Sequence, residues 1–125
     1  MKKVVHTSSA PAAIGPYSQG IAAGGFVFTS GQLPIDPATG SFAGNTVAEQ
    51  TRQSLLNVKA ILESAGTGIE NVVKVTVYLQ NMDDFSEMNN TYMSFFPEQA
   101  PARSAVEVSR LPKDALVEIE AVAIL

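Results

Sequence analysis

The sequence contains no cysteine, no tryptophan and only one histidine, His6. Without cysteine the chain has no disulfide, no thiolate metal site and no cysteine nucleophile. We interpret His6 as a surface residue, so Ser30 lacks a histidine with which to form a nucleophilic pair. No loop has the spacing of a calcium or magnesium site. We therefore expect a function that uses no metal and no cofactor.

Charged residues are also scarce, at 16% of the chain, against about a quarter in typical soluble domains. With so few charged side chains, much of the surface of an isolated monomer would be apolar. This indicates an oligomer. Acidic residues outnumber basic ones, 12 to 8, and the isoelectric point is near 4.8. This balance argues against nucleic acid or an anionic membrane as a partner.

Long apolar runs are missing as well. No segment approaches the roughly 20 apolar residues of a membrane span, and the N-terminus turns polar at Thr7, too early for a secretory signal. We therefore expect a cytoplasmic protein. A length of 125 residues, 46% of them hydrophobic, is enough for one domain with a hydrophobic core. Because no repeat or linker divides the sequence, we expect a single domain over 1–125.

Two helices are predicted after a turn-rich first third that contains a short strand at 26–29. Thr46 and Glu49 have the spacing of a capping box. The first helix then carries an apolar stripe and ends at Gly66. The second opens at Asp84, with Glu87 three residues on, and is stopped by Pro97. The inward-facing residues are Leu55, Val58, Leu62 and Ala65 in the first helix, and Phe85, Met88, Tyr92 and Phe95 in the second.

Three longer strands are predicted from alternation of apolar and polar residues. In 72–79 the side chains of Val73, Val75, Val77 and Leu79 share one face, opposite Lys74, Thr76 and Tyr78. Strands at 103–109 and 116–124, joined by the turn-like segment 110–114, should pair as an antiparallel hairpin. In the last strand Val117, Ile119, Ala121 and Ala123 would lie under the helices, with Glu118 and Glu120 on the other face.

Such a hairpin would bring Arg103 within diagonal reach of Glu118 and Glu120, on the face away from the helices. One interpretation is a solvated outer face, where ion pairs contribute little. The other is a site for a small acid, because a guanidinium fits a carboxylate and a glutamate can deprotonate a water. The low charge content favours the second, since it suggests that another subunit covers this face.

Four separated segments carry a resemblance to one family. They are residues 11–20, 29–32, 101–104 and 111–121, in that order along almost the whole chain. Together they resemble the RidA/YjgF reactive-intermediate deaminases. Four motifs in one order are far more specific than any single short pattern.

The resemblance implies an α+β, chorismate-mutase-like subunit whose mixed or antiparallel sheet carries two helices on one face. It also implies a homotrimer with three sites in the clefts between subunits. By the same resemblance Arg103 binds the substrate carboxylate and Glu118 activates the attacking water. The remaining site residues would be Tyr17, Ser30 and Gly31 around the pocket, Asn89 from the second helix, and Ala105, which replaces a frequent cysteine and leaves a main-chain contact available.

The implied activity is hydrolytic deamination of reactive 2-imino acids to 2-oxo acids and ammonia. These imines arise from enamines such as 2-aminoacrylate and 2-aminocrotonate, and the reaction needs no cofactor. The alternative is a non-catalytic trimeric module that binds a small carboxylate at Arg103. Glu118 beside Arg103 favours catalysis, because carboxylate binding gains nothing from a like-charged neighbour. A third interpretation, RNA cleavage, disagrees with the acidic isoelectric point.

Overall fold

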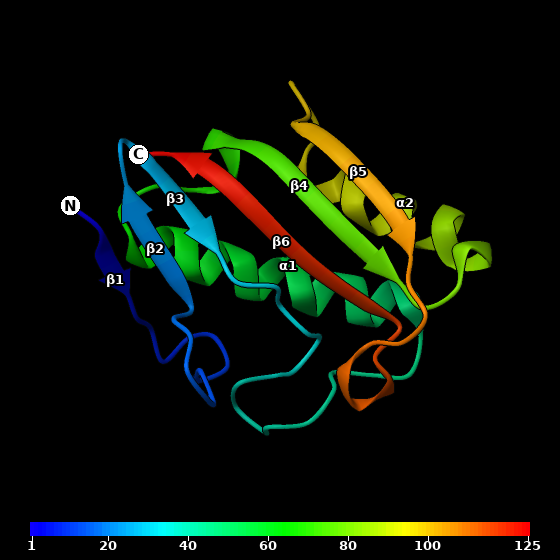
Figure 1. Ribbon diagram of the computed structural model, residues 1–125. Coiled ribbons are helices and arrows are strands. Elements are labelled where there is room, and N and C mark those ends of the chain that lie inside the picture. Colours follow the sequence, from blue (N-terminus) through cyan, green and yellow to red (C-terminus); the bar gives the residue numbers. More distant parts are fainter.

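A six-stranded sheet carries two helices on one of its faces (Figure 1). The computed structural model describes residues 1–125. The strand order is β1-β2-β3-β6-β4-β5, and only β4 and β5 run parallel. This confirms the α+β class and the mixed sheet. The elements are β1 Lys3–Val5, β2 Gly20–Ala23, β3 Phe26–Thr29, α1 Val47–Ser64, β4 Val72–Leu79, α2 Phe85–Phe95, β5 Ala102–Glu107 and β6 Val117–Ile124.

Helix α1 begins as its capping box predicts. The Thr46 hydroxyl accepts a hydrogen bond from the Glu49 amide at 3.1 Å, and the Glu49 carboxylate accepts one from the Thr46 amide at 3.2 Å. The helix ends at Ser64, and Gly66 follows in the left-handed region with φ of +95°. Its apolar stripe is buried against the sheet, which confirms the predicted inner face.

Helix α2 also has the predicted limits, but not the predicted cap. Asp84 is the residue before the helix, and its side chain makes no capping hydrogen bond. Instead Asn81 accepts from the Asp83 amide at 2.9 Å and begins a short 3-10 turn that leads into α2. Met88 and Tyr92 are buried on the inner face, as expected.

Strand β4 buries Val75, Val77 and Leu79 beneath the helices. The prediction for Val73 is wrong, because the pairing of β4 with β6 shifts register between Val72 and Lys74. An irregularity of this kind inserts an extra residue and reverses the alternation of side chains before it. Val72 therefore takes the inner position that the simple alternation gave to Val73.

The predicted hairpin of the last two strands is wrong. β6 lies between β3 and β4, in the middle of the sheet, and β5 lies outside β4 (Figure 1). Helix α2 connects β4 to β5 as a crossover, and such a connection returns the chain parallel to its starting strand. The segment after β5 is therefore no tight turn. It passes the end of β4 and includes a 3-10 turn over Pro112–Asp114.

The main core lies between the sheet and the two helices, where Leu55, Val77, Met88, Val117 and Ile119 are fully buried. The opposite face, called here the open face, has no helix on it. Large apolar side chains are exposed there, among them Phe26, Phe28, Val106 and Ile124. Neither helix is long and apolar enough to cross a membrane.

Candidate active site

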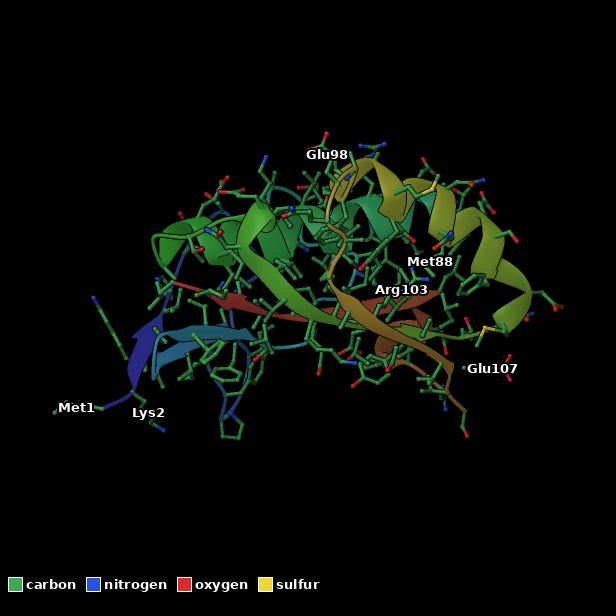
Figure 2. All side chains as sticks on the ribbon, turned by 90° about the horizontal axis from the view of Figure 1, so that it is seen from above. Met1, Lys2, Met88, Glu98, Arg103 and Glu107 are labelled. Carbon is green, nitrogen blue, oxygen red and sulfur yellow. The ribbon has the colours of Figure 1, made fainter.

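Arg103 and Glu118 lie on opposite faces of the sheet. Arg103 pairs with Val75, whose side chain is buried under the helices, and Figure 2 shows Arg103 in the layer between β5 and α2. Glu118 pairs with Tyr78, which alternates with the buried residues of β4 and so belongs to the open face. The predicted convergence of Arg103 with Glu118 and Glu120 within one subunit is wrong, because it depended on the hairpin.

Arg103 is held by three side chains of α2. Its Nη1 donates a hydrogen bond to Asn89 Oδ1 at 2.7 Å, so the structure does bring these two predicted site residues together. Its Cζ lies 4.6 Å from the ring centroid of Tyr92 and 5.4 Å from that of Phe85. Arg103 lines a pocket of about 350 Å³ together with Tyr92, Asn89 and Pro101.

No carboxylate of the subunit pairs with Arg103. The one salt bridge in the chain joins Arg110 to Asp114 at 3.4 Å, on the surface. A partly buried guanidinium without an anion favours binding of one from outside. Ala105 lies two residues further along β5, opposite Val77, and packs against the core on the same side as Arg103.

Glu118 is packed against the backbone of Gly31. A Cβ atom built on Gly31 would overlap the Glu118 carboxylate, so only glycine fits there without a shift. An isolated bridge between Gln32 and Ile119 sets this proximity. Its two backbone hydrogen bonds measure 2.7 and 3.2 Å. The chain segment after β3 is thereby fixed beside the start of β6.

The open face around Glu118 is acidic. Partial burial raises the pKa of the Glu118 carboxyl, and the neighbouring charge of Glu120 raises it further. The pKa of Tyr78 is raised first by burial and then by Glu120. A glutamate with a raised pKa is better matched to proton transfer near neutral pH than an ordinary one. No group of three or more His, Cys, Asp or Glu side chains is arranged to hold a metal ion.

Tyr17 and Ser30 lie on the Glu118 side of the site. The Ser30 hydroxyl donates to the backbone carbonyl of Ser18, which ties the turn containing Tyr17 to the end of β3. Tyr17 is half exposed and lines a pocket of about 390 Å³ together with Gly31 and Lys113. The structure thus divides the predicted residues into two groups. Tyr17, Ser30, Gly31 and Glu118 form one, and Asn89, Arg103 and Ala105 form the other.

Gln19 is a residue that the sequence analysis missed. It is buried, and its side chain donates to the carbonyls of Thr7 and Pro11 at 3.0 and 2.8 Å and accepts from the Thr7 amide at 2.8 Å. It therefore holds the N-terminal loop that forms a wall of the Tyr17 pocket. The only signal was its place inside the motif 11–20, because a single glutamine in a turn-rich segment does not indicate burial.

Comparison with known proteins identifies the family. The family model described as endoribonuclease L-PSP matches residues 7–125. The chain belongs to this family, and its resemblance to RidA/YjgF proteins is confirmed. A RutC family protein of Pyrococcus horikoshii is 58% identical over 123 residues, with 98% of each chain covered. The 2-iminobutanoate/2-iminopropanoate deaminase of Salmonella typhimurium is 54% identical over 127 residues, covering 99% of this chain and 98% of its own.

Solved structures of family members have the same fold. The Escherichia coli YjgF gene product superposes with a TM-score of 0.94 at 51% sequence identity, with 98% of each chain covered. Escherichia coli TdcF, solved with bound serine, gives a TM-score of 0.94 at 46% identity and the same coverage. These values confirm the predicted RidA/YjgF subunit, with its two helices on one face of a mixed sheet.

Proposed function

We propose that this protein is a hydrolytic deaminase that converts reactive 2-imino acids to 2-oxo acids and ammonia. The observation that carries the proposal is the partly buried Arg103 guanidinium, which has no carboxylate partner in its own subunit. A relative 54% identical over nearly the whole chain is named as a deaminase of 2-iminobutanoate and 2-iminopropanoate. Both compounds carry the carboxylate that such a guanidinium fits.

Arg103 binds and orients the substrate carboxylate in this proposal. Asn89 occupies one guanidinium N–H, and the remaining donors are free to form a two-point contact with a carboxylate. This contact fixes the adjacent imine carbon relative to the protein. A small-acid ligand also agrees with the TdcF structure, which holds serine, an amino acid with a nitrogen on the carbon next to the carboxylate.

Glu118 positions and activates the attacking water. Its carboxylate takes a proton from the water as the water oxygen bonds to the imine carbon, and the carbon–nitrogen double bond becomes a single bond. That proton then passes to nitrogen, which gives a carbinolamine with one hydroxyl and one amino group on the same carbon. The same carboxylate next moves the hydroxyl proton to the amino nitrogen, the carbon–nitrogen bond breaks, and ammonia leaves as the carbon–oxygen double bond of the 2-oxo acid forms. The raised pKa of Glu118 suits both the acceptance and the return of the proton.

Two copies of the chain build each site. Because Arg103 and Glu118 face opposite sides of one sheet, a substrate of a few atoms cannot contact both in a single subunit. The proposed site takes Arg103, Asn89 and Ala105 from one subunit. It takes Glu118, Gly31, Ser30 and Tyr17 from the next.

Mixed trimers test both the activity and the shared site. A serine or threonine dehydratase supplies the imine, and ammonia release is followed with and without the protein. We expect Arg103→Lys to weaken binding and turnover, because an ammonium lacks the planar fork. We expect Glu118→Gln to lower turnover by about 10²-fold or more. When the two variants are unfolded together and reassembled at equal amounts, about a quarter of the sites should regain both groups.

Two outcomes would contradict the proposal. If mixing restores nothing although both variants assemble with each other, the site does not combine two subunits. If the wild-type protein binds a 2-oxo acid at Arg103 but does not accelerate ammonia release, it is a carboxylate-binding module and not a deaminase.

A further inference from the structure

Two aromatic side chains contact Arg103, those of Tyr92 and Phe85, and neither has a role in the proposed reaction. We propose that Tyr92 is a positioning residue, whose ring fixes the orientation of the Arg103 guanidinium for the substrate carboxylate. The inference rests on the proposed function of Arg103 and adds a residue that touches the arginine instead of the substrate. Its basis is the 4.6 Å distance between Arg103 Cζ and the centroid of the Tyr92 ring.

The spacing of α2 places three side chains over Arg103. Phe85, Asn89 and Tyr92 follow one another at i, i+4 and i+7, so they share one face of the helix. Asn89 fixes one guanidinium nitrogen by a hydrogen bond, while Tyr92 and Phe85 contact the group through their rings. A ring contact leaves the other N–H donors free, because these point outward in the guanidinium plane.

Tyr92 is itself rigidly held. Its side chain is only 5% exposed, and the ring of Phe96 packs on it at a centroid distance of 4.7 Å. Its hydroxyl is buried and makes no hydrogen bond within 3.5 Å, although it lies near enough to the Arg103 guanidinium for that group to lower its pKa. A variant that keeps the ring and removes the hydroxyl therefore separates the contributions of the two. The ring face is the part of the residue that meets the site.

An aromatic ring suits this position better than a carboxylate would. A cation–π contact orients the guanidinium without neutralising its charge. Burial raises the pKa of Tyr92, and the Arg103 charge offsets part of that rise, so the residue remains an uncharged phenol near neutral pH. An aspartate or glutamate in its place would compete with the substrate for Arg103. Tyr92 therefore holds the arginine and leaves its charge available.

The test compares three variants in the full-length protein. Tyr92→Leu removes the ring, and Tyr92→Phe keeps the ring but removes the hydroxyl. Phe95→Leu is the matched control, because Phe95 lies on the same helix and its ring contacts a different arginine, Arg52, at 5.9 Å. For each, calorimetry with 2-oxobutanoate gives the Kd, and the coupled assay gives KM and kcat.

We expect Tyr92→Leu to raise Kd and KM about five- to tenfold, the scale of one partly desolvated cation–π contact, while kcat changes less than threefold. Tyr92→Phe should restore both constants to within about twofold of wild type, and Phe95→Leu should leave them unchanged. A role in packing alone would not separate KM from kcat in this way. Wild-type Kd and KM in a folded Tyr92→Leu variant would overturn the inference.

A second replacement covers the case in which Tyr92→Leu does not fold. Pentafluorophenylalanine at position 92 keeps the shape of the ring but reverses its quadrupole, so it should raise Kd and KM as the leucine variant does. Unchanged constants with this residue would contradict the role of the ring face. Failure of the proposed function is distinguishable from both results, because it appears in the wild-type protein, which would then not accelerate deamination whether or not it binds 2-oxobutanoate.

Discussion

At the scale of single residues, the environment of Glu118 bears on the role that we propose for it. Its carboxylate rests on the Gly31 backbone and shares the open face with Glu120. Partial burial comes first in raising the pKa of Glu118, and the charge of Glu120 comes second. We therefore expect Glu120 to raise the pKa of the proposed base, although Glu120 has no role of its own in the proposed reaction.

The pH dependence of turnover tests this tuning. As the proposed base, Glu118 would act only when ionised, so kcat/KM should fall as the pH drops through its raised pKa. Glu120→Gln removes a neighbouring negative charge, which lowers the pKa of Glu118 and should move this acidic limb to lower pH. The measurement is kcat/KM across the acidic range for wild type and Glu120→Gln. An unchanged limb would show that Glu120 does not act on Glu118.

At the scale of elements, α2 does more for the proposed site than any other segment. As a crossover it makes β5 parallel to β4, and this pairing turns Arg103 toward the helix layer. The same helix supplies Asn89, Tyr92 and Phe85, which hold the guanidinium. Helix α1 contributes none of these contacts. Its role is to cover the sheet.

A variant that lacks the N-cap of α1 tests whether the two helices have these different roles. Thr46→Ala removes the hydroxyl that accepts from the Glu49 amide and should cost about 1 kcal/mol of unfolding free energy, the usual scale for an N-cap. Thermal unfolding should shift down by about 3–5 °C, while KM and kcat at lower temperature remain those of wild type. The control is Ser86→Ala, at an exposed position in the first turn of α2. A loss of activity without a loss of stability would contradict this division.

At the scale of the whole molecule, the open face is too apolar for a free surface. Phe26, Phe28, Val106 and Ile124 are each between 40% and 47% exposed on it. Phe26 pairs with Ile124 across β3 and β6, and its ring centroid lies 6.3 Å from that of Phe28, so these three form one apolar patch. An exposed apolar patch of this kind often marks an interface. An interface on this face also agrees with the division of Arg103 and Glu118 between the two faces of the sheet, since each site then needs a neighbouring subunit.

We expect a homotrimer in solution. Light scattering should give a mass three times that of the 13.2 kDa chain. Phe28→Glu, which places a charge on the open face, should dissociate the assembly and abolish deamination while the circular dichroism of the subunit is retained. A 13.2 kDa species of wild type at micromolar concentration would contradict the trimer, and the shared site with it.

The sequence alone determined what depends on a few neighbouring residues. The capping box at Thr46, the stop before Pro97 and the alternation of Val117 to Ala123 each act within a short window, so they could be predicted. The family could also be identified from the sequence, because each of its motifs is a continuous stretch of residues. The resemblance named Arg103 and Asn89 as residues of one site, and in the structure a hydrogen bond joins their side chains.

Tertiary structure decided the strand order, and with it the face on which Arg103 lies. Alternation shows which side chains of one strand share a face, but it does not say which neighbour that strand pairs with. That choice depends on contacts between distant segments, here the insertion of β6 between β3 and β4. The shift at Val72 is likewise a property of two paired strands and not of one. For the same reason, a site that spans two subunits has no local signature in either.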